Sequence, residues 1–205
     1  MQTNNDKKEE ILKIALKNFS ENGYEKTKLA TIASEAETST TTIYSFFKIK
    51  HDLFEAAIEY CLRIIDKRLK ENAMNSNSLA EYIELIIAQA KDFSIREKYI
   101  LNFYMLITTN SVPIKNTELI ELFEKNKFSY YTKFYSQYKT KDRFKILFLD
   151  SVLNMYICSF YNEFYKEKLK LYLSLYDHQV DAENTFEANL LDYLKAWMNE
   201  EGKQK

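Results

Sequence analysis

The chain has 205 residues, 46% of them hydrophobic, and a formal net charge of −1, so it can hold one domain of ordinary size plus a small module. Its two glycines and one proline are too few for many hairpins or α/β loops, which predicts an all-α fold. The same scarcity excludes glycine-rich phosphate loops and dinucleotide fingerprints, and no cofactor is expected.

The sequence also indicates the cellular compartment of the protein and whether it holds a metal site. The two cysteines form no CxxC pair and are typical of a reducing compartment. No signal peptide is expected, because residues 1–10 are polar and charged. The most apolar run, 146–161, is interrupted by Asp150 and falls short of the ~20 residues that span a bilayer. A cytoplasmic protein without a membrane partner is therefore expected. His178 has no neighbouring Cys or second His, so no metal site is predicted.

The first predicted helix runs over residues 7–22, after a loose arm over residues 1–6. Its apolar positions recur at helical spacing, and the stripe consists of Ile11, Ile14, Ala15 and Phe19. Gly23 follows in the place where a left-handed cap residue ends a helix.

A second and a third short helix follow, separated by a tight turn over residues 36–38. Thr27 is predicted to be the N-cap of the second helix, which covers residues 28–35. Ser39 is predicted to cap the third helix, because its hydroxyl can accept a hydrogen bond from a backbone N–H two or three residues later. This pattern predicts a helix-turn-helix, a motif that reads the major groove of DNA.

The third helix divides into two faces, because successive residues are rotated by about 100° around a helix axis. The buried face is predicted to hold Ile43, Phe46 and Phe47. The opposite face is small, hydroxylated and basic, with Thr41, Ser45 and Lys48 on it and Thr42 and Tyr44 beside it. Residues 38–51 include two lysines and no acidic residue, which suits contact with phosphates.

The rest of the chain is predicted to be helical, with loops between the helices. The patterns cover residues 51–72, 79–93, 94–109, 117–138, 142–176 and 182–201. Ser78 is predicted to cap one of these helices and Ser94 to start the next. Pro113 lies in the clearest loop.

Residues 7–54 resemble the DNA-binding domain of the TetR family of bacterial transcriptional regulators. The spacing holds without insertion at Ile11, Ala15, Phe19, Gly23, Tyr24, Thr27, Ile32, Ala33, Ala36, Ser39, Ile43, Tyr44, Phe47, Lys50, Leu53 and Phe54. The resemblance implies a DNA-binding domain over residues 1–52 and an effector-binding and dimerisation domain over residues 53–205. It places the helix-turn-helix between Lys28 and Phe47.

The resemblance also implies which residues touch DNA. Those expected at bases or nearby phosphates are Thr40, Thr41, Thr42 and Ser45, those expected on the backbone are Tyr44 and Lys50, and Lys28 and Lys48 add positive charge. The turn departs from the family's common Ala-Gly-Val-Ser, because Glu37 and Thr38 replace glycine and valine. The position of Thr41 is often glycine in the family. These departures affect the operator sequence rather than the fold.

The larger domain is rich in aromatic residues, which serve either a packed core or an aromatic-lined effector cavity. The resemblance favours a cavity for the domain as a whole, and the candidate lining residues are Phe103, Tyr104, Tyr131, Phe134 and Met155. In the family, the last two helices form a four-helix dimer interface. The matching seams here consist of Leu147, Ser151, Met155 and Cys158, and of Phe186, Leu190, Tyr193 and Trp197. A two-fold homodimer implies a palindromic double-stranded DNA operator.

The sequence therefore predicts a ligand-responsive repressor that a small apolar or aromatic effector releases from DNA. Two alternatives stay open. One is a helical interaction protein that does not bind DNA. The other is an enzyme, which is disfavoured because the sequence offers no paired histidines, no metal cluster and no nucleophile beside a base.

Overall fold

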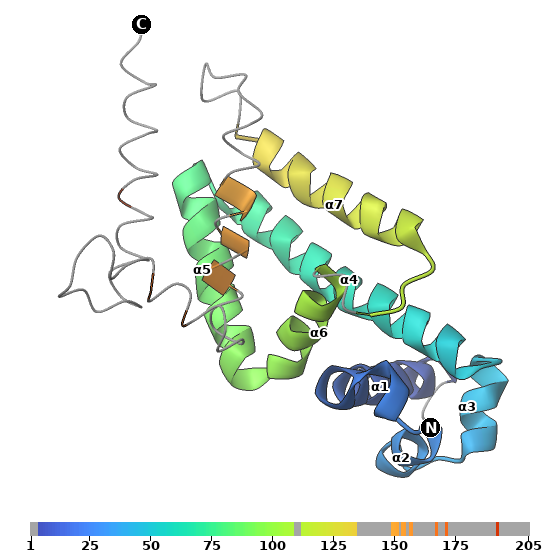
Figure 1. Cartoon of the computed structure of the whole chain (residues 1–205). Helices are drawn as coiled ribbons and strands as arrows, with labels where there is room; N and C mark the ends of the chain where they lie inside the picture. The colour runs from blue at the N-terminus through green and yellow to red at the C-terminus, as the bar shows by residue number, and fades with distance from the viewer. Residues whose placement is uncertain are drawn as a thin grey trace, which may run out of the picture. The chain divides into compact units, whose positions relative to one another are not determined.

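The computed structural model describes residues 4–108, 112–134, 149–151, 153, 154, 156, 157, 167, 171 and 192. Over these residues the fold is all-α and has no strand, as the scarcity of glycine and proline predicts. The helices drawn in Figure 1 are α1 (Asn4–Lys26), α2 (Leu29–Glu35), α3 (Thr40–Phe46), α4 (Lys50–Asn75), α5 (Leu79–Arg96), α6 (Lys98–Thr108) and α7 (Thr117–Thr132). Within the described part of the chain, no helix has the length and apolar character needed to cross a membrane.

The chain divides into two compact units. The first comprises Met1–Arg68 and Arg96–Lys125, and the second comprises Leu69–Ile95 and Asn126–Lys205. The three N-terminal helices thus pack in one unit with the beginning of α4 and with α6. The functional boundary expected at residue 52 stays a prediction.

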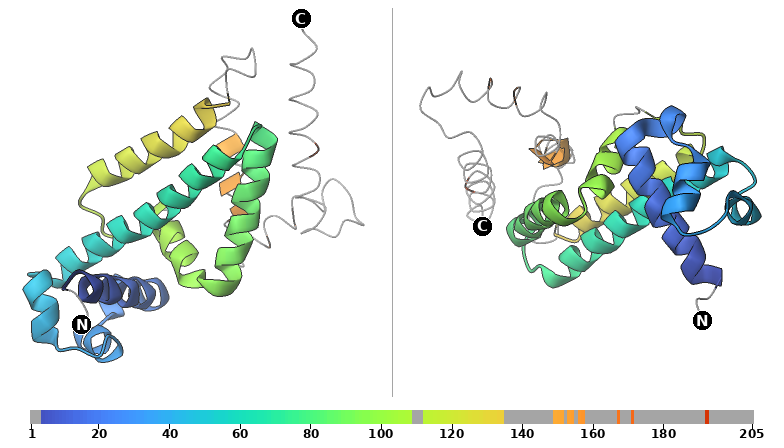
Figure 2. Two further views of the ribbon diagram at one scale, coloured as in Figure 1. Left: turned by 180° about the vertical axis from the view of Figure 1, so that it is seen from behind. Right: turned by 90° about the horizontal axis from the view of Figure 1, so that it is seen from below.

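An aromatic cluster holds the first unit together. The ring of Phe19 in α1 meets Phe54 in α4 edge-on, with centroids 5.0 Å apart. Phe54 in turn meets Phe103 in α6 edge-on at 5.8 Å. All three side chains are fully buried. Figure 2 shows α1 lying across α6, in agreement with the dense packing between these two helices. The three-helix module is therefore anchored on α4 and α6 by aromatic packing.

Several predicted helix boundaries differ from the structure; for example, the helix predicted over residues 117–138 ends at Thr132. The first helix begins at Asn4, so residues 4–6 of the expected N-terminal arm are helical. Ser94 lies inside α5 rather than at the start of the next helix, which begins at Lys98. The reason is local: the Ser94 hydroxyl donates to the carbonyl of Lys91, a back-bond that a serine makes within a helix. The cap predicted at Ser78 is confirmed, because its hydroxyl accepts from the N–H of Glu81 at 3.2 Å.

Candidate DNA-binding site

Gly23 interrupts α1 three residues before its last residue, Lys26, at the place where the sequence predicts a helix end. Its backbone has φ +76°, in the region that side chains with a Cβ disfavour. The predicted role of Thr27 is wrong, since the N-cap of α2 is Lys28 and makes no side-chain cap bond. Thr27 is buried instead, and its hydroxyl lies 2.7 Å from the carbonyl oxygen of Gly23 and 3.0 Å from that of Asn18. The hydroxyl therefore donates to a carbonyl of α1 and does not cap the N–H groups of α2.

A buried amide joins α1 to α2. Asn18 is 4% exposed, and its Nδ2 donates to the Glu35 Oε2 at 2.9 Å and to the Ile14 carbonyl at 3.1 Å. A buried amide that finds both partners fixes the distance between the two helices, because leaving it unpaired would carry a desolvation penalty. The sequence pattern shows this asparagine only as an interruption of an apolar face.

The turn of the helix-turn-helix ends α2 in a Schellman motif. The N–H of Thr38 donates to the Ala33 carbonyl at 2.9 Å, and the N–H of Glu37 donates to the Ser34 carbonyl at 3.2 Å. This motif needs a left-handed backbone at the residue after the C-cap Ala36. That residue is Glu37, which has φ +46°. Glu37 thus adopts, at the position where the family commonly has glycine, a backbone conformation that glycine favours.

The N-terminus of α3 is capped as predicted. Ser39 has an extended backbone, and its Oγ accepts from the N–H of Thr42 at 3.0 Å. Of the predicted buried face, Ile43 and Phe47 are buried, at 1% and 5% exposed, but Phe46 is only half-buried. Phe46 is the last residue of α3, where the helix has less of the core to cover it.

The outer face of α3 carries the residues expected to read DNA. Thr41, Tyr44 and Ser45 are exposed, and Tyr44 retains 52% of its surface. Thr40 and Thr42 are half-buried. The Ser45 hydroxyl donates to the Thr42 carbonyl at 2.7 Å, so its oxygen remains available as an acceptor.

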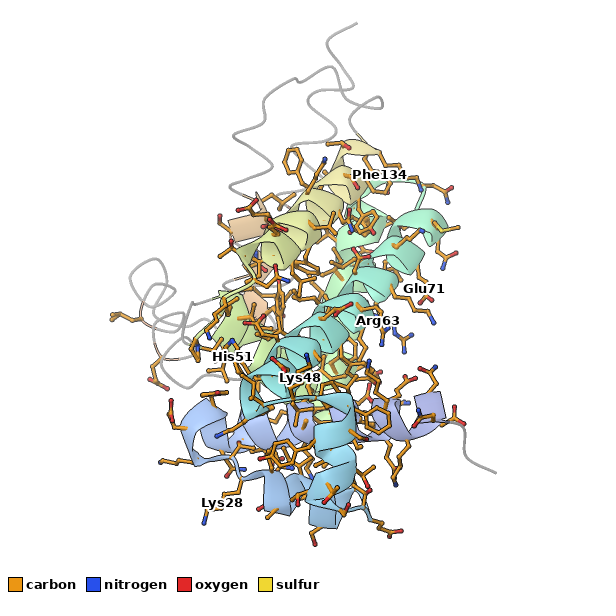
Figure 3. The ribbon with its side chains drawn as sticks, turned by 90° about the vertical axis from the view of Figure 1, so that its right-hand side faces the viewer. Lys28, Lys48, His51, Arg63, Glu71 and Phe134 are labelled. Carbon is orange, nitrogen blue, oxygen red and sulfur yellow. The ribbon has the colours of Figure 1, made fainter. Side chains whose placement is uncertain are left out.

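Three lysines frame this face. Lys28 and Lys48 are exposed, and Figure 3 shows Lys28 pointing away from the ribbon before α2. Lys48 lies in the bend after α3 rather than on the helix. Lys50 is held: its ammonium lies 4.6 Å above the centre of the Tyr24 ring and donates to the Glu25 carbonyl at 3.2 Å. This leaves a positive charge at a defined position beside α3.

The residues expected to line an effector cavity belong to different compact units. Phe103 and Tyr104 are buried in the first unit, and Tyr131 and Phe134 are buried in the second. Met155 lies outside the described residues. The Tyr131 hydroxyl donates to Asp150 Oδ1 at 3.3 Å, and the same carboxylate accepts from two further side chains, Lys127 and Asn154, both at 3.0 Å. This polar cluster is a feature that helical periodicity did not predict.

Most of the expected dimer seam lies outside the described residues. This applies to Leu147, Met155, Cys158, Phe186, Leu190, Tyr193 and Trp197. Ser151 is described and is exposed. The homodimer therefore stays a prediction.

These helices and their exposed face define a helix-turn-helix DNA-binding domain of bacterial regulator type. Residues 11–57 match the sequence model of the bacterial regulatory proteins of the tetR family. They belong to the TetR family, and the family expected from the sequence is confirmed. The chain thus carries a DNA-binding domain of the TetR type over these residues.

The proteins that are similar to this chain include a curated regulator and a protein of solved structure. An uncharacterised HTH-type transcriptional regulator, YerO of Bacillus subtilis (strain 168), is 32% identical over 124 residues, which are 59% of this chain and 42% of that protein. The chain thus spans less than half the length of this curated relative. A crystal structure of a gamma-butyrolactone receptor, an ArpA-like protein, superimposes with a TM-score of 0.54 over 93% of this chain and 98% of that one. At 19% identity, that likeness shows the fold alone.

Proposed function

We propose that the chain is a ligand-responsive transcriptional repressor that binds a palindromic operator as a homodimer in the cytoplasm. The observation that carries this proposal is the exposed face of α3. Ser39 caps the helix, and its outer face presents Thr41, Tyr44 and Ser45. Exposed lysines, Lys28 before α2 and Lys48 after α3, add positive charge to the same module. Threonine can offer a hydroxyl to base edges and a methyl group to thymine, which suits recognition in the major groove.

We propose that one set of residues contacts the bases and another set contacts the DNA backbone. Thr40, Thr41, Thr42 and Ser45 lie at bases or nearby phosphates, and Lys28, Tyr44, Lys48 and Lys50 contact the DNA backbone. Backbone contacts set affinity and its salt dependence, while base contacts set sequence preference. Substitutions in the backbone-contacting set should therefore weaken binding to all sequences, and substitutions in the base-contacting set should change the sequence preference.

Effector control is proposed to act through the packing between the domains. A ligand can shift the DNA-binding equilibrium only by its preference for one conformation over the other. The likeness to a gamma-butyrolactone receptor supports a small apolar effector. Native mass spectrometry of the purified protein tests for such a molecule.

The test of DNA binding is an electrophoretic mobility shift with the DNA that flanks the chain's own gene. A regulator gives a discrete complex that unlabelled flanking DNA competes away and random DNA does not. Retention at low salt without sequence preference would contradict specific regulation. A complete lack of binding would favour the alternative of a helical interaction protein.

A further inference from the structure

The carbonyl of Ala36 remains without a backbone partner where α2 ends. The Schellman motif satisfies the carbonyls of Ala33 and Ser34, and the N–H of Ala36 itself donates to Ile32. The partner of the Ala36 carbonyl comes from another helix: the ammonium of Lys7, in α1, donates to it at 2.7 Å. This contact joins residues 29 positions apart.

The ammonium of Lys7 also forms an ion pair with Glu10. It lies 2.8 Å from Glu10 Oε2, one turn further along α1, and the Lys7 side chain is 22% exposed. A cation at the C-terminal end of a helix is stabilised by the helix dipole, and a charged donor makes a stronger hydrogen bond than a neutral one. Lys7 therefore acts as a side-chain cap for α2.

The turn beside Ala36 has a specific need for such a cap. Glu37 adopts φ +46°, which glycine adopts without penalty but which a residue with a Cβ disfavours. The turn sets the direction in which α3 leaves α2. A weakly favoured turn would present the reading face correctly in only a fraction of the molecules.

We propose that Lys7 is a positioning residue for DNA recognition, because its bond to Ala36 stabilises the helix-turn-helix turn that Glu37 leaves strained. The proposal rests on the proposed DNA-binding function. Lys7 acts in it through the turn and not through a phosphate. The apparent Kd is the intrinsic Kd divided by the fraction of molecules that are competent to bind, so the loss of the cap weakens binding to every operator alike.

The test uses four versions of the full chain: the wild-type protein, Lys7→Met, Glu37→Gly, and the double variant Lys7→Met/Glu37→Gly. The probe is a duplex that the wild-type protein has selected from a randomised library. Lys7→Met is expected to weaken binding about threefold to tenfold with Glu37 present. The loss is expected to shrink to less than about twofold with glycine at the turn, because glycine favours the left-handed backbone by itself.

Two further variants separate positioning from the loss of charge. Lys7→Arg keeps a cationic donor and is expected to restore most of the affinity. Lys13→Met removes an exposed lysine from the same helix and is expected to leave affinity unchanged. Positioning also predicts an unchanged slope of log affinity against log salt for Lys7→Met. A slope that is shallower by about 0.9 would mean a direct phosphate contact and would overturn the proposal.

Hydrogen exchange in the free protein tests the cap without DNA. The N–H of Thr38 closes the turn on Ala33 and is expected to exchange faster in Lys7→Met, but at the wild-type rate in Lys7→Met/Glu37→Gly. Unchanged exchange in Lys7→Met, or equal losses of affinity in both backgrounds, would overturn the role of Lys7. If the wild-type protein selects no duplex, the DNA-binding function itself fails, whatever the exchange of Thr38.

Discussion

Glu55 in α4 accepts a hydrogen bond from the backbone N–H of Lys115, 60 residues further along the chain, at 2.8 Å. Lys115 lies in the connection between α6 and α7. The same carboxylate oxygen is 3.2 Å from His51 Nε2, but the two atoms are not aligned as in a hydrogen bond. The His51 ring packs edge-on against Tyr24 in α1 at 5.9 Å. One carboxylate thus links the α6–α7 connection to the helices that position the DNA-reading surface.

Glu55→Ala is expected to lower the free energy of unfolding by about 1–2 kcal/mol, because it leaves the Lys115 N–H without its acceptor. Glu55→Gln should lose less than half of this amount, since an amide oxygen still accepts from that N–H. Urea denaturation measures both, with Glu59→Ala on an exposed position of the same helix as the control. Equal losses in the two Glu55 variants would place the effect in the charge rather than in the hydrogen bond.

Lys50→Ala should weaken binding to all DNA sequences and make the slope of log affinity against log salt shallower by about 0.9. The physical reason is that the bond to Glu25 and the ring of Tyr24 hold the Lys50 ammonium at a fixed place beside α3. Fluorescence anisotropy over a salt series measures the slope. Lys13→Ala serves as a matched loss of charge, and an identical slope for both variants would argue against a phosphate contact at Lys50.

Thr41→Ala should change the preference at particular base pairs by about 1–3 kcal/mol, because it removes a hydroxyl and a methyl group from the exposed face of α3. Competition between single-base variants of the selected operator measures this preference. Thr132→Ala, at an exposed position that ends α7, is the control. An unaltered base preference in Thr41→Ala would show that the outer face of α3 is assigned wrongly.

Cys61 should make the protein less stable at alkaline pH. Burial raises the pKa of its thiol above the ordinary value of 9.0, so the unfolded chain loses this proton before the folded one does. The contribution to stability is complete below about pH 9 and falls above it by up to about 1.4 kcal/mol per pH unit. Tyr99 adds to the decline only above pH 10, because burial and then Glu97 raise its pKa to about 12.

Chemical denaturation between about pH 9 and pH 10 compares the wild-type protein with Cys61→Ala. The variant should lack the decline that the thiol causes, and only the slopes are compared because the smaller side chain also changes packing. Parallel slopes for the two proteins would contradict the assignment to Cys61.

Local chemistry made much of the DNA-binding module predictable. A cap such as Ser39 needs only residues three positions away, and Gly23 marks a backbone conformation by its own lack of a Cβ. The rotation of about 100° per residue around a helix axis correctly predicted that Ile43 and Phe47 are buried and that Thr41 is exposed. These features depend on neighbours along one helix or turn, which the order of residues shows directly.

Partners that meet only after folding could not be predicted in this way. Thr27 has the residue type of an N-cap, but the carbonyls of α1 compete successfully for its hydroxyl. Lys7 and Glu55 look like ordinary charges on helix surfaces until the tertiary fold brings Ala36 and Lys115 beside them. The residue types were visible, but their partners lie 29 and 60 positions away.

We propose that the surface of α3 reads a specific palindromic operator from a dimer. Selection from a randomised duplex library, followed by native mass spectrometry of the complex, tests it most directly. We predict an enriched inverted repeat whose half-sites lie about one helical turn of DNA apart, or a multiple of it, with chains bound in pairs. Failure to enrich any sequence, or equal retention of all sequences that disappears with salt, would contradict the claim.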